Sequence, residues 1–509
     1  MAIQGELANL DDINGLLWGG WKWEFTNLTY AFPTSAADFV DYFDIQGFEA
    51  FNPAQQTSAL RALHMYAAVC GLTFTEAAPG DVGNIRFVEA DMYDSGDGNG
   101  LHGPGGGLSA EGTPPDSDLF PEYSHGDTWF TRGNYDAPKI GNYEAAAGIM
   151  HEIGHALGLK HGHGINKLTG PGANSILLPV DQDSQEYSIM TYRAYVGQQP
   201  DNTGFFQNPV DYPSTLMQND IYALQWLYGA DYSYNSGNTT YKWSTSTGEM
   251  TVNGKKAASF FGGQHFHKKI FMTVWDGNGN DTYDFSNFTT NQTIRLDPGA
   301  WSTPDVRKLA NLGSGETAIG SIANARVFAD EFRGYIENAK GGSGADDIRG
   351  NEVANRLYGN GGKDVIYGWE GKDYLSGGSR GDTLFGGTGK DTLFGGTGKD
   401  TLTGGTSADK FLYTAASQGS DVIKDFGTSD ALVFEGSAFK LGSYKGELKS
   451  GNFVSRDSGH KASQRDDYFI FDESNDSLWF DANGKGAGGD ILIADLNNFG
   501  LVAGDIMIV

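Results

Sequence analysis

The sequence predicts an α+β domain followed by an all-β parallel β-roll. Two patterns carry this prediction: a histidine-rich helix, HEIGHALGLKH, at residues 151–161, and a nine-residue glycine and aspartate repeat at residues 341–412. Helix and strand patterns mix in the first half of the chain, whereas glycine-punctuated, strand-like sequence fills the second. We therefore predict a short N-terminal segment at residues 1–20, a first domain at 21–245 and a second domain at 246–509.

Composition restricts the class of protein. The chain has 509 residues and a net charge of -29, from 35 Lys and Arg against 64 Asp and Glu. This charge argues against nucleic acid and anionic membranes as partners, because both would repel the chain. The single cysteine, Cys70, excludes an internal disulfide, and we expect it to be buried and inert. The N-terminus lacks the pattern of an export signal, and no stretch approaches the ~18 apolar residues of a membrane span.

Four segments of the first domain have clear secondary-structure patterns. Residues 52–77 predict an amphipathic helix that runs into a strand, and residues 83–93 predict a further strand. A helix is predicted at residues 142–159, with Asn142 as its N-cap, and another at residues 219–229. The histidine-rich motif therefore lies on a helix.

The spacing of the histidines on that helix predicts a zinc site. Residues four apart share a helix face, so His151 and His155 point the same way. Gly158 can end the helix with a positive φ, and the chain then returns His161 as a third ligand. Three neutral imidazoles and one open position are the ligand set of a catalytic zinc ion. Glu152 lies about 100° around the helix, where it can accept the proton of a water that the zinc activates.

At these residues the sequence resembles the metzincins, whose signature is this extended histidine motif followed by a methionine turn. The turn is present as YSIMTY, residues 187–192. The resemblance implies that Met190 forms a hydrophobic floor beneath the zinc. It also implies that Tyr192 is an extra zinc ligand in the resting state and hydrogen-bonds the oxyanion once substrate is bound. A tyrosine at this position occurs in serralysins and astacins, and the glycine and aspartate repeats favour the serralysins.

The resemblance to a serralysin-type metzincin implies an α+β zinc protease domain followed by a calcium-binding β-roll of the RTX type. It implies peptide-bond hydrolysis, with Glu152 as the general base that later delivers the proton to the leaving amine. One catalytic zinc ion and several structural calcium ions are implied as cofactors. The stretch GLHGPGGGLSAEG, residues 100–112, resembles the metzincin edge strand that pairs with an extended substrate, and a flexible loop is an equal alternative.

Eight nonapeptides follow the pattern Gly-Gly-x-Gly-x-Asp-x-apolar-x without a break from residue 341. This pattern is that of a calcium-binding β-helix repeat. The glycines permit a tight turn whose carbonyls face inward, and the sixth position adds a carboxylate, so the site is made of oxygen ligands. The predicted calcium ligands of the repeats are Gly342, Gly344, Asp346, Gly359, Gly361, Asp364, Asp373, Asp382, Gly386, Gly387, Gly389, Asp391, Gly395, Gly396, Gly398, Asp400 and Asp409.

Other positions of the repeat carry further predictions. The eighth position supplies the interior of the roll, which a flexible linker would not need. Its residues are Ile348, Leu357, Ile366, Leu375, Leu384, Leu393, Leu402 and Phe411. Asn355 stands at the sixth position of the second repeat, so we expect a weaker site there. Arg380 and Ser407 replace a glycine, and we expect them to distort their loops.

Two segments before the repeats resemble further calcium loops of the serralysins. WDGNGNDTYDFS, residues 275–286, resembles the first calcium loop of the C-terminal domain and implies Asp276, Gly279 and Asp281 as ligands. YNSGNTTY, residues 234–241, resembles the linker loop, although it departs from the family in residue type. It implies Asn235, Gly237 and Thr239 as ligands.

The remaining histidines have simpler interpretations. We predict that His163 is a solvent-exposed residue and not a ligand, because it lies off the motif spacing. His265 and His267 are taken as surface residues of one strand face. His102 and His125 lie in loops rich in Gly and Pro, where a second zinc ion has no further support.

Two other functions stay open: a calcium-dependent extracellular binding or surface protein with secondary protease activity, and a zinc hydrolase acting on something other than protein. Expected partners are protein or peptide substrates and a small protein inhibitor, with a monomeric chain. The repeats need extracellular calcium and the sequence shows no N-terminal signal. We therefore predict secretion through a type I (ABC) exporter that reads the C-terminal residues GDIMIV, 504–509, as the serralysins imply.

Overall fold

The structure, a computed structural model, describes most of the chain. The described residues are 2–4, 11–39, 44–94, 101–102, 110–115, 125–163, 176–199, 211–256, 268–329, 331–441, 444–462, 467–483, 489–497 and 499–509. They form two compact units: Met1–Thr239, Ser246–Gly279 and Val306–Tyr335, and then Thr240–Thr245, Asn280–Asp305 and Ile336–Val509. The units interleave along the chain, and the single domain boundary at residue 245 stays a prediction. No helix within the described ranges is long and apolar enough to cross a membrane.

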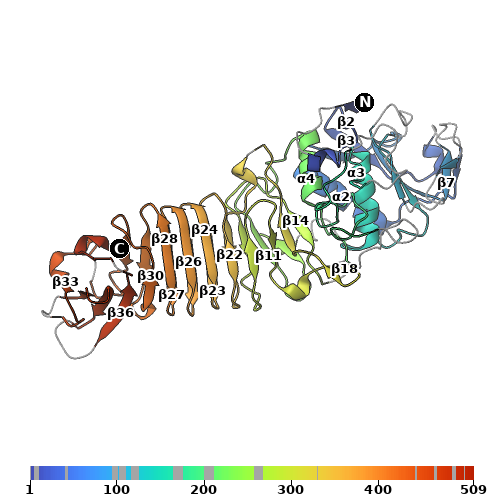
Figure 1. Cartoon of the computed structure of the whole chain (residues 1–509). Coiled ribbons are helices and arrows are strands. Elements are labelled where there is room, and N and C mark those ends of the chain that lie inside the picture. The colour runs from blue at the N-terminus through green and yellow to red at the C-terminus, as the bar shows by residue number, and fades with distance from the viewer. Residues whose placement is uncertain are drawn as a thin grey trace. The chain divides into compact units, whose positions relative to one another are not determined.

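A five-stranded sheet organises the first unit (Figure 1). Its order is β5 (Thr73–Glu76), β3 (Asn27–Ala31), β6 (Ile85–Ala90), β10 (Asp127–Thr131) and β9 (Ala110–Gly112). The first four strands run parallel, and β9 pairs antiparallel with β10 at one edge. Every residue of β6 is buried, as the central strand of a parallel sheet requires. The strands predicted within residues 52–77 and 83–93 are confirmed.

Helix α2 (Pro53–Val69) begins at a complete N-terminal cap. The side chain of Asn52 accepts hydrogen bonds from the amides of Ala54 and Gln55, and the Gln55 side chain accepts from the amide of Asn52. Proline at the first helical position is pre-set for the helix and needs no amide partner. The helix ends at Cys70, whose thiol is 1% exposed, as predicted.

The histidine-rich helix has two parts. A π-helical turn, η4 (Glu144–Met150), leads directly into α3 (His151–Ala156). The Asn142 side chain accepts a hydrogen bond of 3.1 Å from the amide of Ala145, which confirms its capping role. The amide of His151 donates to the carbonyl of Ala146, five residues back, so the helix is wider here than predicted. Such insertions often lie at functional sites.

Helix α4 (Gln218–Tyr228) confirms the last predicted helix, and Gly229 follows it with a φ of 79°. The N-terminal segment contributes β1 (Ala2–Gln4) and α1 (Asp11–Asn14), and β2 (Trp21–Trp23) follows it. The other strands of the first unit are β4 (Asp44–Gln46), β7 (Met92–Asp94), β8 (Leu101–His102), β12 (Met250–Val252), β13 (Lys255–Lys256), β14 (Met272–Val274), β18 (Asn311–Gly313), β19 (Glu316–Thr317) and β20 (Ile322–Asn324). Short 3-10 turns lie at Ala36–Asp38, Val306–Lys308 and Phe332–Gly334.

The second unit is a parallel β-roll, in which successive strands alternate between two sheets (Figure 1). One sheet runs through β11 (Thr240–Trp243), β15 (Thr282–Asp284), β21 (Asn338–Lys340), β23 (Arg356–Gly361), β25 (Tyr374–Ser379), β27 (Thr392–Thr397), β29 (Lys410–Tyr413), β31 (Ala431–Phe434), β37 (Ile506–Ile508) and β32 (Gly446–Glu447). The other runs through β16 (Thr293–Arg295), β22 (Asp347–Arg349), β24 (Val365–Gly371), β26 (Thr383–Gly389), β28 (Thr401–Thr406), β30 (Asp421–Ile423), β36 (Asp490–Asp495), β35 (Ser477–Asp481), β34 (Phe469–Asp472) and β33 (Phe453–Arg456).

The repeat length explains the roll. Each nonapeptide supplies one strand and one turn, so residues 18 apart stack in the same sheet, as Leu357 does on Leu375. The eighth-position side chains from Ile348 to Phe411 are all at most 1% exposed, which confirms the predicted interior. The last strand, β37, pairs with β31 and β32 and buries Ile506 and Ile508.

Candidate metal centres

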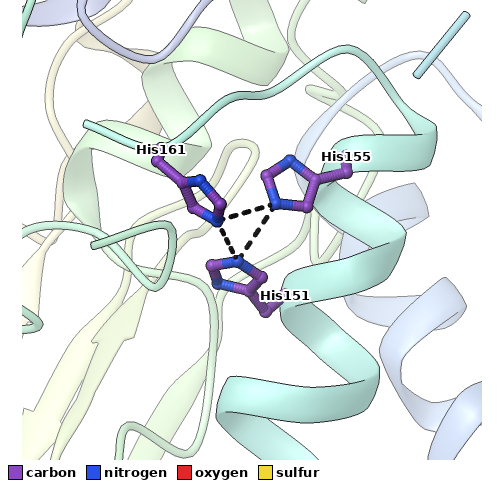
Figure 2. A group of neighbouring side chains, drawn as sticks. All are labelled: His151, His155 and His161. Carbon is purple, nitrogen blue, oxygen red and sulfur yellow. Dashed lines mark hydrogen bonds between the residues drawn. The ribbon is translucent and has the colours of Figure 1, made fainter. Parts of the chain in front are cut away.

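Three imidazoles converge in the first unit (Figure 2). The Nε2 atoms of His151, His155 and His161 lie 3.0 to 3.1 Å from one another. His151 and His155 come from the same face of α3, while His161 returns after Gly158, whose φ is 99°. Among the described residues, these three histidines form a group of possible metal ligands whose ligand atoms all lie within 4.8 Å of one another. The helix spacing and the turn at Gly158 therefore bring the three rings together, as predicted.

The protonation state of these rings favours the binding of a cation. Nδ1 of His151 lies 2.8 Å from the carbonyl oxygen of Ile189, and Nδ1 of His155 lies 2.8 Å from that of Leu159. A carbonyl only accepts, so both Nδ1 atoms carry the proton and both Nε2 atoms present lone pairs. Burial lowers the pKa of His151 to about 4 and that of His155 to about 3, so the rings are neutral at neutral pH.

The donor set fits zinc. The Nε2 lone pairs of His151 and His155, which face each other at 3.1 Å, repel unless a cation lies between them. Tetrahedral zinc with Zn–N bonds of about 2.0–2.1 Å places its ligand nitrogens roughly 3.3 Å apart. The separations in the trio need to open only slightly to reach that value.

The predicted neighbours of the zinc site lie around the trio. Glu152 is 5% exposed, and Met190 is fully buried. A Cβ added at Gly154 would lie 2.6 Å from Sδ of Met190, so the glycine lets the methionine turn pack directly against the zinc helix. The Tyr192 ring lies 4.6 Å from the His161 ring. Burial, and then the negative charge of Glu152, raises the pKa of Tyr192 above its usual value.

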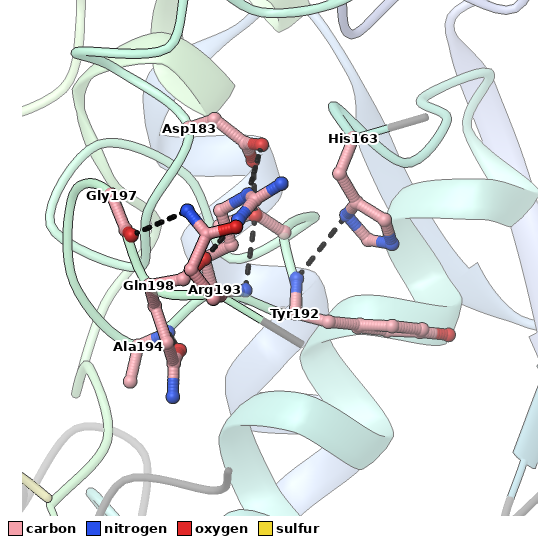
Figure 3. A network of polar contacts seen from close by, with 9 residues as sticks. His163, Asp183, Tyr192, Arg193, Ala194, Gly197 and Gln198 are labelled. Carbon is pink, nitrogen blue, oxygen red and sulfur yellow. Dashed lines mark hydrogen bonds and ion pairs between the residues drawn. The ribbon is translucent and has the colours of Figure 1, made fainter. Parts of the chain in front are cut away.

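The prediction that His163 is solvent-exposed is wrong, because this residue is 2% exposed. Its Nδ1 accepts a hydrogen bond of 3.3 Å from the amide of Tyr192, and the two rings lie 4.6 Å apart (Figure 3). The sequence suggested exposure because His163 follows a glycine outside the motif. The methionine turn, 29 residues further on, covers it.

A polar network, which the sequence did not indicate, supports the methionine turn (Figure 3). The carboxylate of Asp183 accepts from the Thr191 hydroxyl and from Nε of Arg193, at 2.5 and 2.7 Å. From the other side, the buried carboxylate of Asp220 accepts from the Ser188 hydroxyl at 2.6 Å and from the Ile189 amide at 2.9 Å. These bonds tie residues 188–193 to Asp183 and to α4.

The predicted substrate-pairing segment is described in part. Its end, β9, is the antiparallel edge of the five-stranded sheet, and residues 103–109 lie outside the described residues. His265 and His267 also lie outside them, and the side chain of His102 is not described. His125 is 8% exposed and is not part of the metal-binding trio.

The second unit carries a ladder of buried aspartates. In each rung, the Oδ1 atom of one aspartate accepts a hydrogen bond of 2.8 to 2.9 Å from the backbone amide of the residue 18 positions earlier. The rungs start from Asp346, Asn355, Asp364, Asp373, Asp382 and Asp391. The predicted carboxylates are therefore aligned by the same bonds that define the roll.

The outer oxygens of the ladder fit calcium. The Oδ2 atoms of six predicted ligands are buried and have no hydrogen-bond partner: Asp364, Asp373, Asp382, Asp391, Asp400 and Asp409. A Cβ at Gly359 would lie 2.3 Å from Oδ2 of Asp364, and one at Gly386 2.5 Å from Oδ2 of Asp391, so only glycine leaves room beside each carboxylate. Uncompensated buried carboxylates are costly, and an oxygen-binding cation would satisfy them.

At the first two repeats, the side chain in the sixth position has hydrogen-bond partners for all of its polar atoms. Nδ2 of Asn355 donates to the carbonyl of Glu337 and to Oδ1 of Asn351, so this rung is satisfied without a cation, in agreement with a weak site. Both carboxylate oxygens of Asp346 also accept backbone amides.

Arg380 and Ser407 leave the rungs of the ladder in place, and they adopt φ values of 83° and 90°. The φ values at this position in other repeats are 123° to 148°, so the backbone of the two loops departs from that of the glycine loops at Gly362, Gly371, Gly389 and Gly398. The rungs at Asp382 and Asp409 keep lengths of 2.8 and 2.9 Å. The substitution therefore strains the backbone of the loop and leaves the rung intact, and its effect on a bound cation stays a prediction.

Three aspartates beyond the repeats extend the ladder, and the sequence analysis missed them. Asp421 and Asp430 accept from the amides of Asp400 and Asp409, each across 21 residues, and Oδ2 of Asp421 is buried without a partner. Asp425 accepts from two glycine amides of the last repeat. The signal was present, because nine residues separate Asp421 from Asp430, but a three-residue insertion after Asp409 breaks the register.

The calcium ligands predicted before the repeats are distributed between the two units. The Thr239 hydroxyl lies 2.9 Å from the carbonyl oxygen of Gly237 and 3.3 Å from that of Asn235, so these three oxygens gather in one turn. Asp276 and Gly279 belong to the first unit and Asp281 to the second, and both aspartates are at most 1% exposed.

Comparison with known proteins agrees with the fold and the zinc geometry. The matrixin family matches residues 22–174, and the family described as peptidase M10 serralysin C terminal matches residues 238–500. The chain therefore belongs to the serralysin family of M10 peptidases.

Named relatives support this membership. A metallopeptidase AprA of Pseudomonas marginalis is 34% identical over 334 residues, 64% of this chain and 60% of the relative. A metalloprotease AprA of Pseudomonas entomophila is 34% identical over 357 residues, 67% and 63% of the two chains. A serralysin of Proteus mirabilis is 32% identical over 330 residues, 64% and 60%. The chain thus spans about 60% of the length of the curated relatives it matches.

Proposed function

We propose that this chain is a secreted zinc metalloendopeptidase that hydrolyses peptide bonds in extracellular proteins. The observation that carries the proposal is the convergence of three neutral imidazole nitrogens beside Glu152. Metalloproteases among the named relatives support the class of reaction. The open edge of the five-stranded sheet at β9 supports an extended peptide as substrate, because an edge strand can pair with one.

We assign the roles as follows. Zinc, held by His151, His155 and His161, would supply a Lewis acid that polarises the scissile carbonyl and makes water a nucleophile at neutral pH. Glu152 accepts the proton of the attacking water and delivers it to the leaving amine. Tyr192 would be an extra ligand of the zinc in the resting state, and in the reaction its phenol would donate a hydrogen bond to the developing oxyanion. In the zinc-free chain its raised pKa keeps the phenol protonated, as a donor must be.

Calcium is proposed as the structural cofactor of the roll. Six unpartnered buried carboxylate oxygens in successive turns support several ions, held by the aspartates and by the loops of Gly342, Gly344, Gly361, Gly387, Gly389, Gly395, Gly396 and Gly398. A roll that needs calcium would work in calcium-rich surroundings outside the cell. We therefore propose secretion, with a type I (ABC) exporter as the route.

A zymogram with casein tests the proposal against its alternatives. Full-length protein with zinc and calcium should clear casein, and a zinc chelator should abolish clearing. Glu152→Gln should bind zinc and leave casein intact. Clearing by Glu152→Gln would point to a secondary or contaminating protease. Zinc binding without clearing of casein or other proteins would favour a zinc hydrolase with a non-protein substrate.

A further inference from the structure

The third zinc ligand lacks the outer hydrogen bond that fixes the other two. His151 and His155 each bond a backbone carbonyl through Nδ1. Nδ1 of His161 is buried and has no hydrogen-bond partner among the residues described. Histidines that bind metals usually donate this second nitrogen to a carbonyl or carboxylate, which fixes the ring. Apart from ring packing against Tyr192 and His163, it is therefore the backbone that holds His161 in place.

The neighbouring residue, Lys160, holds that backbone. Its side chain is 1% exposed, and its ammonium donates to the carbonyls of Gly15 at 2.7 Å, Ile176 at 2.8 Å and His161 at 3.4 Å. Its amide donates to the carbonyl of Leu16 at 2.8 Å. A buried ammonium is costly unless its three N–H groups find acceptors, and here three carbonyls supply them. Lys160 thus joins three chain segments that are distant in sequence.

The segment that contains Gly15 also closes the end of the zinc helix. Nε1 of Trp23 donates to the carbonyl of Ala156 at 2.9 Å, and the amide of Trp18 donates to the carbonyl of Gly158 at 3.0 Å. These carbonyls belong to the last turn, where a helix leaves its acceptors unpaired. A Cβ at Gly158 would lie 2.4 Å from the carbonyl oxygen of Trp21, so the segment runs in direct contact with the turn before His161.

We propose that Lys160 is a positioning residue for zinc. Its bonds to Gly15 and Ile176 fix the backbone of His161 and replace the outer hydrogen bond that the ring of His161 lacks. This inference rests on the proposed zinc site and adds a residue that touches neither metal nor substrate. It predicts that zinc affinity depends on the ammonium of Lys160. If the ammonium only stabilised the fold, its loss would lower stability and leave zinc affinity unchanged.

The test compares two lysine variants of the full-length chain. Lys160→Met keeps the length of the side chain and removes its donors. Lys308→Met is the matched control, because Lys308 is also buried and its Nζ also donates to a backbone carbonyl, that of Lys268 at 3.1 Å. Zinc ion is titrated against a fluorescent zinc chelator, with calcium present. We expect Lys160→Met to bind zinc about 10- to 100-fold more weakly, as when other outer partners of metal ligands are lost. Lys308→Met should bind zinc as the unsubstituted chain does.

Each outcome decides the inference. Unchanged zinc affinity in folded Lys160→Met would overturn it, and so would an equal loss in both variants. If Lys160→Met does not fold, Lys160→Gln takes its place, since its amide can still donate to one carbonyl and should give an intermediate loss. Full zinc affinity in folded Lys160→Gln would also overturn the inference. Absence of zinc binding in the unsubstituted chain would instead reject the proposed function.

Discussion

Nδ1 of His151 donates a hydrogen bond of 2.8 Å to the carbonyl oxygen of Ile189, and the amide of Ile189 donates to the buried carboxylate of Asp220 at 2.9 Å. The backbone of Ile189 thus links the first zinc ligand, His151, to the start of α4. Asp220 also accepts from Ser188 and from the amide of Met217. Burial raises its pKa to about 6, and these bonds oppose the rise, so it is mostly a carboxylate at neutral pH.

Replacement of Asp220 should damage both the fold and the zinc site. Asp220→Ala leaves three buried donors without an acceptor, and each such loss costs about 1–3 kcal/mol. We expect the free energy of unfolding to fall by about 3 kcal/mol or more, and zinc affinity to fall by about 10-fold, because the acceptor of His151 is no longer fixed. Urea unfolding of the zinc-free chain and a zinc competition titration measure the two effects.

Ser188→Ala is the control for that prediction. It removes one of the donors to Asp220 and leaves the bond to Ile189 in place. Because Ser188 Oγ also accepts from the Met190 amide at 3.0 Å, stability should fall by about 2 kcal/mol, and zinc affinity should fall less than in Asp220→Ala. An equal loss of zinc affinity in both variants would show that Asp220 does not act through Ile189.

Glu152 should be separable from metal binding. Glu152→Gln keeps the size of the side chain and removes the base, so peptidase activity should fall by about 100-fold or more with zinc still bound. His161→Ala should instead lose zinc, since it removes a ligand. Metal analysis and a peptide hydrolysis assay distinguish the two variants. Near-normal turnover in Glu152→Gln would exclude its role as the base.

Regular spacing explains which parts could be predicted from sequence. His151, His155 and His161 lie within one helix and its turn, so helix geometry alone brings them together. The eighth-position residues recur every nine positions, and their burial follows from that period. Local capping residues such as Asn142 are likewise set by the next few amides.

Contacts between distant segments explain what could not be predicted. Asp220 lies 31 residues after Ile189, and Lys160 lies 145 residues after Gly15. No periodic pattern connects such pairs. His163 was misjudged because its burial depends on Tyr192, and Asp421 was missed because an insertion shifts its register. The residues that support a metal site from outside can therefore be found only from the fold, whereas the ligands could be predicted from the sequence.

Tyr192 and His163 should act as one unit in the reaction. Tyr192→Phe removes the oxyanion donor and should lower kcat by roughly 100-fold with little change in KM. His163→Leu removes the acceptor of the Tyr192 amide, so the ring is less well placed and kcat should fall by about 10-fold. In the double variant the second change should add almost nothing. Additive losses in steady-state kinetics would mean that His163 acts elsewhere.

Calcium should reverse the effect of one substitution on the free energy of unfolding. At pH 9, where Asp382 is ionised, Asp382→Asn keeps the Oδ1 acceptor of the ladder and removes a charge that burial, and then Asp364 and Asp400, disfavour. Without calcium, the free energy of unfolding should rise by about 1 kcal/mol. With calcium it should fall, because a ligand is lost. Asn355→Asp should do the reverse without calcium, since it places an oxygen against the carbonyl of Glu337. Urea unfolding of the whole chain, with calcium or a calcium chelator, tests both signs.

Calcium binding should release protons near neutral pH. Burial, and then the charge of neighbouring aspartates, raises the pKa of Asp373 to about 7 and that of Asp382 to about 8 in the calcium-free chain. Both are raised above their unfolded value, so these groups stabilise the calcium-free roll at acid pH, and that contribution is lost as pH rises through about 7 to 8. Calcium binds the deprotonated form, so its affinity should increase over the same range. Calcium added in weak buffer at pH 6.5 should therefore acidify the solution, whereas at pH 9 it should release almost no protons. Equal release at both pH values would mean that these carboxylates are not the ligands.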